Sequence, residues 1–424
     1  MSHKAMSQET KVLIFLISFV ILLYGASSMF FAKEAYKELA ILMEVIQKIR
    51  DEYVESPDMN KVQDGAMRGL LEALDPQSTF MTREQLEEYE KRNADGSVGA
   101  GMVISKRSDV FYVVSVEAGG AADKANIRPG DYLLSVNAEE IHNKNLLEVN
   151  NLLRGVPGTG AKLTIFRGNQ TSSQDIDLTF QEQASVHVTS RMLDGNIGYL
   201  RIVSLKGASV EQAKVNLKTL ISAGADKILL DLRGCAEGDT AAGAEVANFF
   251  LKDGVIYFSQ DSNGEKLDVV TASPEKFVTG LPTALLLNGS TAGAAEIIAG
   301  ALKDHGRARL IGEKTFGIGA SQKTIRLKSG AALILSTAKF STPNGGIIQG
   351  EAAARKSGIE PDFESPDTGR RQELAVEAYY DYDEENDNDK YRMIQEKIRQ
   401  IQLDKALEVL LGAENPAESM KKAA

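Results

Sequence analysis

The stretch "TALLLNGSTAGAAEIIAGAL", Thr283 to Leu302, predicts a buried strand, a turn of small residues and a helix. The run "TALLL" has the length of a strand, and "EIIAGAL" has helical spacing. A sharp strand-to-helix turn of this kind is where acyl-transfer enzymes hold an exposed serine or cysteine. Gly293 stands at the centre of this turn and offers no side chain for attack. The stretch therefore predicts an α/β unit whose nucleophile position is vacant.

Strands and helices alternate on both sides of this unit. "NIGYLRIV" (Asn196–Val203) and "KILLDLRG" (Lys227–Gly234) are predicted strands, and a helical pattern lies between them. Another helical pattern, "AAGAEVANFFL", follows, and the strand patterns "RARLIGEKT" and "AALILSTAKFSTP" come after Leu302. Near-continuous apolar strands that alternate with helices indicate an α/β core with helices covering its sheet. We place this core at residues 186–368.

The N-terminus carries a long apolar segment. "VLIFLISFVILLYGASSMFFA", residues 12–32, has about the ~20 residues that one transmembrane helix needs. Lys4 and Lys11 precede it, so residues 1–11 are expected to stay in the cytoplasm. A cleaved signal peptide is the alternative, but apolar residues resume at "MFF", which favours an uncleaved anchor. This predicts a single-pass inner-membrane protein with its bulk on the periplasmic or extracytoplasmic side.

Helical patterns flank the middle of the chain. The apolar stripes of Tyr36–Val54 and Lys61–Asp75 predict a helical region over residues 36–92. Near the other end, "DYDEENDND" is an acidic run that indicates a solvated linker over residues 379–390. An amphipathic helix is expected over residues 391–412, closed by a glycine cap.

Composition excludes several classes of function. The chain has 424 residues, 43% hydrophobic and 25% charged, which is ordinary for a folded protein. Its net charge of -11 argues against a nucleic-acid partner, because no basic field would attract phosphates. Cys235 is the only cysteine, so no internal disulfide can form. The histidines show no metal-ligand spacing, and we expect no metal and no cofactor. They are His3, His142, His187 and His305.

A β-rich stretch precedes the α/β core. Within it, "AGGAADKANIRPGDYLLSVNAEEI" (residues 118–141) resembles part of a PDZ domain, which we place at residues 97–184. In that family a glycine-containing loop turns N–H groups toward the terminal carboxylate of a bound peptide, which adds a strand to the domain. A small β-domain without a ligand is the alternative. The residues that match the loop are Gly99, Ala100, Gly101, Met102 and Val103.

The order of these regions, with several short motifs, resembles the carboxyl-terminal processing (tail-specific) serine peptidases. "LDPQSTFM" begins at Leu74, "DLRGCAEGD" at Asp231 and "GEKTFGIGASQ" at Gly312. "NGSTAGAAEIIAGAL", "STPNGG" and "GIEPD" complete the set in the same order as in the family. The resemblance implies an α/β core of the ClpP/crotonase type with an inserted PDZ domain.

The same resemblance implies a serine nucleophile and a lysine general base. The nucleophile falls on Gly293 and the base on Ile318, so both reactive groups are missing, whereas Gln322, which would orient the base, is retained. A hydroxyl attacks only when a neighbouring group takes its proton. The family's oxyanion turn is altered at Glu237 and Gly238, and a carboxylate there has the wrong sign to stabilise negative charge.

Neighbouring residues offer poor substitutes. Ser290 and Thr291 are displaced from the nucleophile position, and a misplacement of 1 Å can cost about a hundredfold in rate. Lys314 and Lys323 flank the base position and are expected to be solvated.

Two functions remain open. The first is a pseudopeptidase that binds peptide or protein C-termini through its PDZ domain and acts as a scaffold, adaptor or regulator. Its natural partner would be an active paralogous peptidase. The alternative is an active serine endopeptidase that uses a rearranged or composite site.

Overall fold

The computed structural model describes residues 39–94, 96–107, 110–168, 172–182, 187–350, 357–366 and 387–412, with single residues 369 and 373. The predicted membrane segment lies outside these residues. Among the helices that are described, none combines the length and apolar character needed to cross a bilayer. The chain falls into two compact units, Met1–Met67 and Arg68–Ala424. Residues 39–52 are helical, and a second helix, α2, spans Met59–Glu72.

The centre of the larger unit is a six-stranded sheet. Neighbouring strands pair in parallel from the second strand to the sixth, whereas the first strand is antiparallel. Parallel strands place their carboxyl ends at one edge, where sites of α/β proteins gather. In order across the sheet, the strands are β10 (Val188–Leu193), β11 (Ile197–Ile202), β12 (Lys227–Asp231), β15 (Thr283–Leu287), β16 (Ala308–Gly312) and β19 (Phe363–Glu364).

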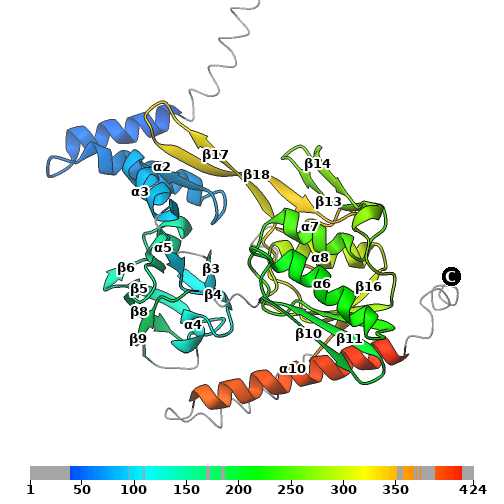
Figure 1. Cartoon of the computed structure of the whole chain (residues 1–424). Helices are drawn as coiled ribbons and strands as arrows, with labels where there is room; N and C mark the ends of the chain where they lie inside the picture. Colours follow the sequence, from blue (N-terminus) through cyan, green and yellow to red (C-terminus); the bar gives the residue numbers. More distant parts are fainter. Residues whose placement is uncertain are drawn as a thin grey trace, which may run out of the picture. The chain divides into compact units, whose positions relative to one another are not determined.

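Helices cover both faces of this sheet (Figure 1). Successive strand residues point to opposite faces, so Leu230 joins one apolar cluster and Leu229 the other. Because both faces are buried, the strands are apolar at nearly every position, as the sequence predicted. One face packs against α6 (Ser209–Ser222), α7 (Thr240–Asn248) and α8 (Ala294–Asp304), and the other against α10 (Asp387–Gly412).

Helix α10 begins inside the stretch that was predicted to be a linker. Residues 387–390 are its first turn, because the helix starts at Asp387. Gln402, Ala406 and Leu410 are buried at four-residue spacing and so form its inward seam. The buried Gln402 amide accepts from Arg233 Nη1 at 2.9 Å and donates to the Ser365 carbonyl at 2.9 Å. These bonds satisfy a polar side chain that burial would otherwise penalise.

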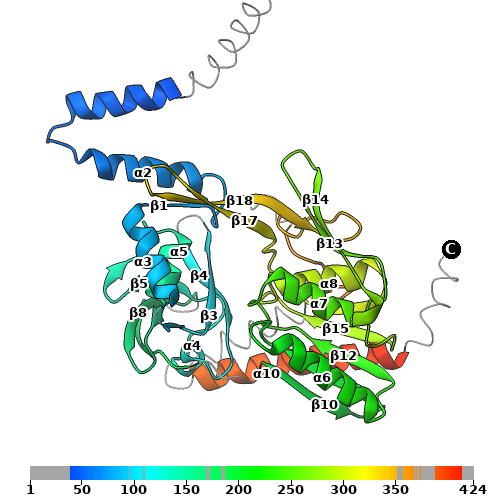
Figure 2. The same ribbon diagram turned by 45° about the horizontal axis from the view of Figure 1, so that its top comes forward.

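A second sheet shows that the PDZ domain is an insertion. Strand β1 (Thr79–Met81) precedes the domain and pairs antiparallel with β18 (Ala332–Ser341), which follows the domain. Figure 2 shows these two strands side by side. The remaining strands are β13 (Val255–Gln260), β14 (Lys266–Thr271) and β17 (Ala320–Arg326). The short helices α3 (Arg83–Ala94) and η1 (Pro274–Lys276) complete the elements outside the domain.

The inserted domain has its own buried core around Phe111, Leu133 and Leu163. The turn before strand β5 (Tyr132–Val136) is held by Asp131, which receives two hydrogen bonds from Arg167 at 2.7 Å each. Such bidentate pairs are among the stronger charged contacts. The strands are β2 (Val98–Gly99), β3 (Met102–Arg107), β4 (Val110–Val116), β5 (Tyr132–Val136), β6 (Glu139–Glu140), β7 (Arg154–Gly155), β8 (Gly160–Phe166) and β9 (Gln174–Thr179). The helices are α4 (Ala121–Lys124) and α5 (Leu146–Leu152).

Candidate functional site

The predicted nucleophile turn lies between β15 and α8. Gly293 precedes the first residue of α8 and has φ +61° and ψ −119°. This backbone conformation favours glycine, and a larger residue holds it only under strain. A Cβ atom placed on Gly293 would meet no atom within 4 Å. The predicted nucleophile turn therefore combines a backbone conformation that is strained for other residues with open space for a side chain.

One buried carboxylate joins this turn to the predicted base position. Glu296, in the first turn of α8, is fully buried. Its Oε2 accepts from Gly293 N at 2.9 Å and from Ile318 N at 2.8 Å. Its Oε1 accepts from Gly317 N at 2.7 Å and from the Thr315 hydroxyl. The main-chain N–H groups of Gly293 and Ile318, at the predicted nucleophile and base positions, thus donate to the same oxygen atom, Oε2 of Glu296.

Burial controls the charge state of this carboxylate. Removal from water raises the pKa of Glu296 to about 7, although the four donors oppose that change. No role for Glu296 was predicted from the sequence. Its spacing was a usable signal, because a glutamate three residues after a helix cap often binds back to the cap's N–H.

The retained glutamine lies on an exposed strand. Gln322 belongs to β17, its side chain is exposed, and its amide donates to the Gln77 carbonyl at 2.7 Å. Ile318 lies just before β17 and is half-buried. The structure therefore brings Gly293 and Ile318 together through Glu296, whereas the Gln322 amide serves a contact with the segment before β1.

The hydroxyls nearest to Gly293 are used in structural bonds. Ser290 Oγ donates to the Val114 carbonyl of the PDZ domain at 2.6 Å. Thr291 Oγ1 donates to the Leu232 carbonyl at 3.0 Å and is fully buried. Of the flanking lysines, Lys314 pairs with Glu360 at 2.6 Å and Lys323 is exposed. None of these contacts joins a hydroxyl to an amine.

The loop after β12 carries the altered oxyanion turn. At its start, Asp231 is fully buried and receives bonds from Tyr199 and from the Arg233 guanidinium. Burial would raise the pKa of Asp231, but the charge of Arg233, the hydrogen bonds from Arg233 and Tyr199 and the charge of Arg201 together outweigh burial, so the pKa is lowered. Further on, the Glu237 carbonyl accepts from Leu205 N at 2.8 Å. At Gly238, with φ +130°, a Cβ would lie 2.4 Å from the Leu205 side chain.

The Glu237 side chain turns toward the PDZ domain. Its carboxylate pairs with Lys206 Nζ at 2.7 Å, and the side chain is 18% exposed. This pairing offsets part of the negative charge beside the turn. The unfavourable effect of Glu237 on an oxyanion stays a prediction.

The predicted carboxylate loop opens on a groove of about 380 Å³. Gly101 has φ +73°, which turns the chain into β3. Ala100 N already donates to the Leu153 carbonyl at 2.9 Å, so that amide is used within the domain. Positive charge is available from Arg154, whose buried Nε has no hydrogen-bond partner among the described residues. The groove is lined by Ser97, Val98, Gly99, Ala100, Gly101, Met102, Asn150, Leu153, Arg154, Lys206 and Glu237.

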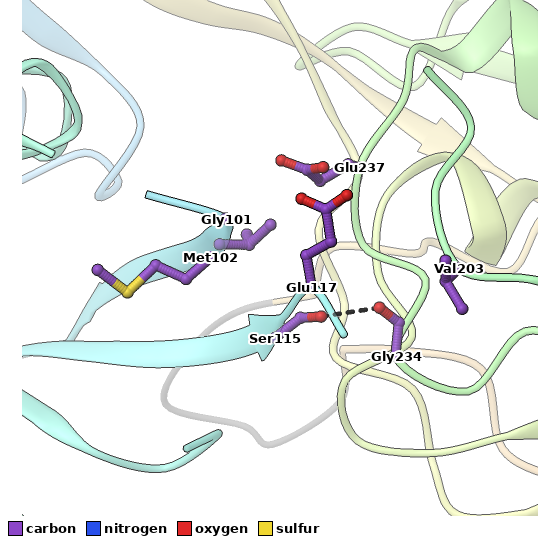
Figure 3. Close-up of a pocket in the computed structure, with 8 residues that line it drawn as sticks. Gly101, Met102, Ser115, Glu117, Val203, Gly234 and Glu237 are labelled. Atoms are coloured by element: carbon purple, nitrogen blue, oxygen red, sulfur yellow. Dashed lines mark hydrogen bonds between the residues drawn. The ribbon is translucent and has the colours of Figure 1, made fainter. Parts of the chain in front are cut away.

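A smaller cavity of about 10 Å³ lies where this loop faces the core. Figure 3 shows the carboxylates of Glu117 and Glu237 side by side there. Burial, and then the charge of Glu237, raise the pKa of Glu117, while Lys206 opposes them. No signal in the sequence pointed to this pair, because the two residues belong to different domains. The other lining residues are Gly101, Met102, Val103, Ser115, Val203 and Gly234.

Among the described residues, no three or more His, Cys, Asp or Glu side chains are grouped so that they could hold a metal ion. The contacts reported above are hydrogen bonds and ion pairs within the chain. The candidate sites are thus the strained turn at Gly293 and the groove of the PDZ domain.

Known proteins resemble both parts of the chain. A model of peptidase family S41 matches residues 196–365, and one of the PDZ domain matches residues 96–178. The carboxy-terminal processing protease CtpA of Bacillus subtilis (strain 168) is 32% identical over 345 residues, 80% of this chain and 72% of that protein. The carboxy-terminal-processing protease of Bartonella bacilliformis is 31% identical over 335 residues, 78% of this chain and 76% of that protein.

A solved structure agrees with this likeness. The photosystem II D1 C-terminal processing protease has a TM-score of 0.65 and 26% identity, with 76% of this chain and 86% of that chain covered. The resemblance stated from the motifs is thereby confirmed, and so is the α/β peptidase core with a PDZ domain. The chain belongs to the carboxy-terminal processing protease family, with the fold of peptidase family S41.

Proposed function

We propose that this chain is a pseudopeptidase that binds the C-termini of peptides or proteins through its PDZ domain. It acts as a scaffold, adaptor or regulator, and an active peptidase of the same family is its natural partner. The apolar segment over residues 12–32 tethers it to the inner membrane, and the bulk of the chain lies on the periplasmic side.

The observation that carries this proposal is the strained turn without a side chain. Gly293 holds a conformation that costs a non-glycine residue about 1–3 kcal/mol, which active sites tolerate because the geometry serves the reaction. A mechanism of this family needs a hydroxyl beside an unprotonated amine. The nearby hydroxyls of Ser290 and Thr291 donate to main-chain carbonyls, and Ile318 supplies hydrocarbon at the base position.

The groove supports the binding role. A peptide carboxylate beside Gly101 would meet the positive charges of Arg154 and Lys206, which both line the groove. Main-chain pairing along an exposed strand edge would supply affinity that depends little on sequence. This function needs neither the missing hydroxyl nor the missing amine.

Loss of catalysis is tested on the full-length chain in detergent. The chain is incubated with a serine-reactive fluorophosphonate and, separately, with a reduced and carboxymethylated protein as substrate. We expect neither covalent labelling nor time-dependent cleavage. Labelling that disappears in Ser290→Ala or in Thr291→Val would identify a rearranged nucleophile and would favour the active-peptidase alternative.

Restoring the reactive groups tests the role of Glu237. We expect Gly293→Ser with Ile318→Lys to hydrolyse the substrate poorly, because a carboxylate stands beside the oxyanion turn. Adding Glu237→Gly should then raise the rate by about a hundredfold or more, the usual weight of one oxyanion-hole group. Full activity from the double change alone would show that Glu237 does not disturb this turn.

Binding is tested with pairs of fluorescent peptides that differ only in a free or an amidated C-terminus. We expect the free carboxylate to bind at least about tenfold more tightly, and Arg154→Met to reduce that preference. The control is Asn150→Ala, which changes the same groove without changing its charge. Equal affinity of the two peptide forms would contradict carboxylate recognition.

A further inference from the structure

The small cavity between the PDZ loop and the core contains a buried carboxylate without a hydrogen bond. The Glu117 side chain is 8% exposed, and neither of its oxygens has a hydrogen-bond partner among the described residues. His187 Nδ1 lies 3.6 Å from Glu117 Oε1, where it forms an ion pair only when protonated, and it also has no hydrogen-bond partner. Buried carboxylates normally accept hydrogen bonds from several donors. The free chain supplies no such donor to Glu117 from its described residues, so we expect a bound group to supply one.

Negative charge is in excess around the cavity. Figure 3 shows Glu117 and Glu237 directed toward the same space from the two domains. Lys206 is half exposed and forms its ion pair with Glu237 at 2.7 Å, whereas its charge acts on Glu117 without a direct pair between them. Placing a second positive charge between them would remove their repulsion and complete the bonds of Glu117.

The size of the cavity limits what this positive group can be. Its volume of about 10 Å³ holds roughly one water-sized group. A lysine ammonium has this size and carries three donors, whereas a guanidinium is a broad planar fork. The cavity shares Gly101, Met102 and Glu237 with the larger groove, so a side chain of a groove-bound peptide could reach it.

From these contacts we infer that the cavity binds the ammonium group of a lysine side chain on a peptide held in the PDZ groove. Glu117 is the primary acceptor and Glu237 is the second. This assignment rests on the proposed peptide-binding function and adds a preference for one kind of side chain. The peptide would then be recognised at two points. The loop and Arg154 bind its terminal carboxylate, and Glu117 and Glu237 bind a lysine upstream of it.

The test uses the full-length chain and fluorescent ten-residue peptides of alanine and serine with a free C-terminus. Each peptide carries one lysine, placed in turn at each of the six positions before the last residue. Matched peptides carry norleucine, arginine or Nε-acetyl-lysine at the same position. At one position we expect lysine to bind at least about tenfold more tightly than norleucine and acetyl-lysine, and more tightly than arginine.

Glu117→Gln should abolish this preference while leaving the affinity for the norleucine peptide unchanged. The variant should melt at or above the temperature of the unmodified chain, because it removes a buried unpaired carboxylate. Glu237→Gln is the second variant. It should weaken the preference for lysine less, since the Glu237 carboxylate already forms an ion pair with Lys206. A lysine preference that survives in Glu117→Gln would overturn the assignment.

The outcomes separate this inference from the proposed function. If all peptides bind equally well, peptide binding stands and the lysine pocket is wrong. If no peptide binds, the proposed function fails, and the inference fails with it. If CaCl₂ or MgCl₂ alone raises the melting temperature of the unmodified chain but not of Glu117→Gln, the cavity binds a metal ion, and the lysine assignment is overturned.

Discussion

Two buried glutamates on opposite sides of the domain junction differ in how they are satisfied. Glu296, in the core, accepts four hydrogen bonds from the turn at Gly293 and from the segment around Ile318. Glu117, in the PDZ domain, accepts none from the described residues. Burial raises the pKa of both carboxyls. The same side chain in similar burial therefore has two different roles.

We assign Glu296 to the folded framework and Glu117 to the proposed binding site. Around Glu296 the main-chain N–H groups of Gly293, Gly317 and Ile318 and the Thr315 hydroxyl all have an acceptor, so this carboxylate is part of the folded framework. Around Glu117 the polar capacity is unused, which costs stability unless a ligand uses it. Three measurements test this contrast.

The largest effect is expected from truncating the two glutamates. Glu296→Ala leaves three main-chain N–H groups and the Thr315 hydroxyl without their acceptor and opens a cavity. We expect it to lower the free energy of unfolding by about 3–5 kcal/mol in urea denaturation. Glu117→Ala, the matched control, should lower it by less than about 1 kcal/mol. Equal losses would mean that Glu296 is no more structural than Glu117.

The next effect is a dependence of stability on pH. In the unfolded chain Glu296 loses its proton near 4.5, but in the folded chain its pKa is about 7. Between these values the folded state holds more protons, so the free energy of unfolding falls as the pH rises. The decrease in unfolding free energy caused by ionisation of Glu296 reaches at most about 3 kcal/mol and is complete above pH 7.

Glu296→Gln isolates this term because it cannot ionise. The unmodified chain and the variant are unfolded in urea at pH 4.5, 5.5, 6.5 and 7.5. As the pH rises across this range, the free energy of unfolding of the unmodified chain should fall steadily relative to that of Glu296→Gln. A constant difference would mean that the carboxyl ionises equally easily in both states.

The smallest effect is expected at the turn itself. Gly293→Ser should fold, because a Cβ there meets no atom within 4 Å, yet φ of +61° should cost about 1–2 kcal/mol. Gly99→Ser is the control, because it also has open space but no positive φ. Thermal melting of both variants measures the difference. If the two variants melt alike, the turn at Gly293 is not strained.

Much of the fold followed from local patterns. The strands on either side of the turn were predicted because two buried faces require apolar residues at nearly every position, as in β12 and β15. The assignment of the nucleophile position to Gly293 and of the base position to Ile318 stays a prediction, made because the motifs around them resemble those of the family in order and spacing. Helix α10 was predicted, but its first turn was assigned to a linker because the segment is acidic. Acidic residues also favour a helix N-terminus, so this pattern fits both structures.

Contacts between distant segments could not be predicted. Gln322 was predicted to be retained beside a missing base, and its amide bonds to the Gln77 carbonyl from an exposed strand. Ser290 was predicted to be displaced from the nucleophile position, but its bond to Val114 depends on how the PDZ domain meets the core. A single sequence contains no signal for such pairs, because neither residue type nor spacing specifies which segments meet.

By itself, the sequence determined the order of the domains and the strand-turn-helix unit, and it predicts that Gly293 and Ile318 stand where the family carries a hydroxyl and an amine. These are properties of residue type and of short-range spacing. Only the tertiary structure decided that Glu296 binds both vacant positions and that Glu117 faces Glu237 without a hydrogen bond. The physical reason is that the cost of burying a charge depends on which donors the fold brings within about 3 Å, and those donors come from segments far apart in the chain.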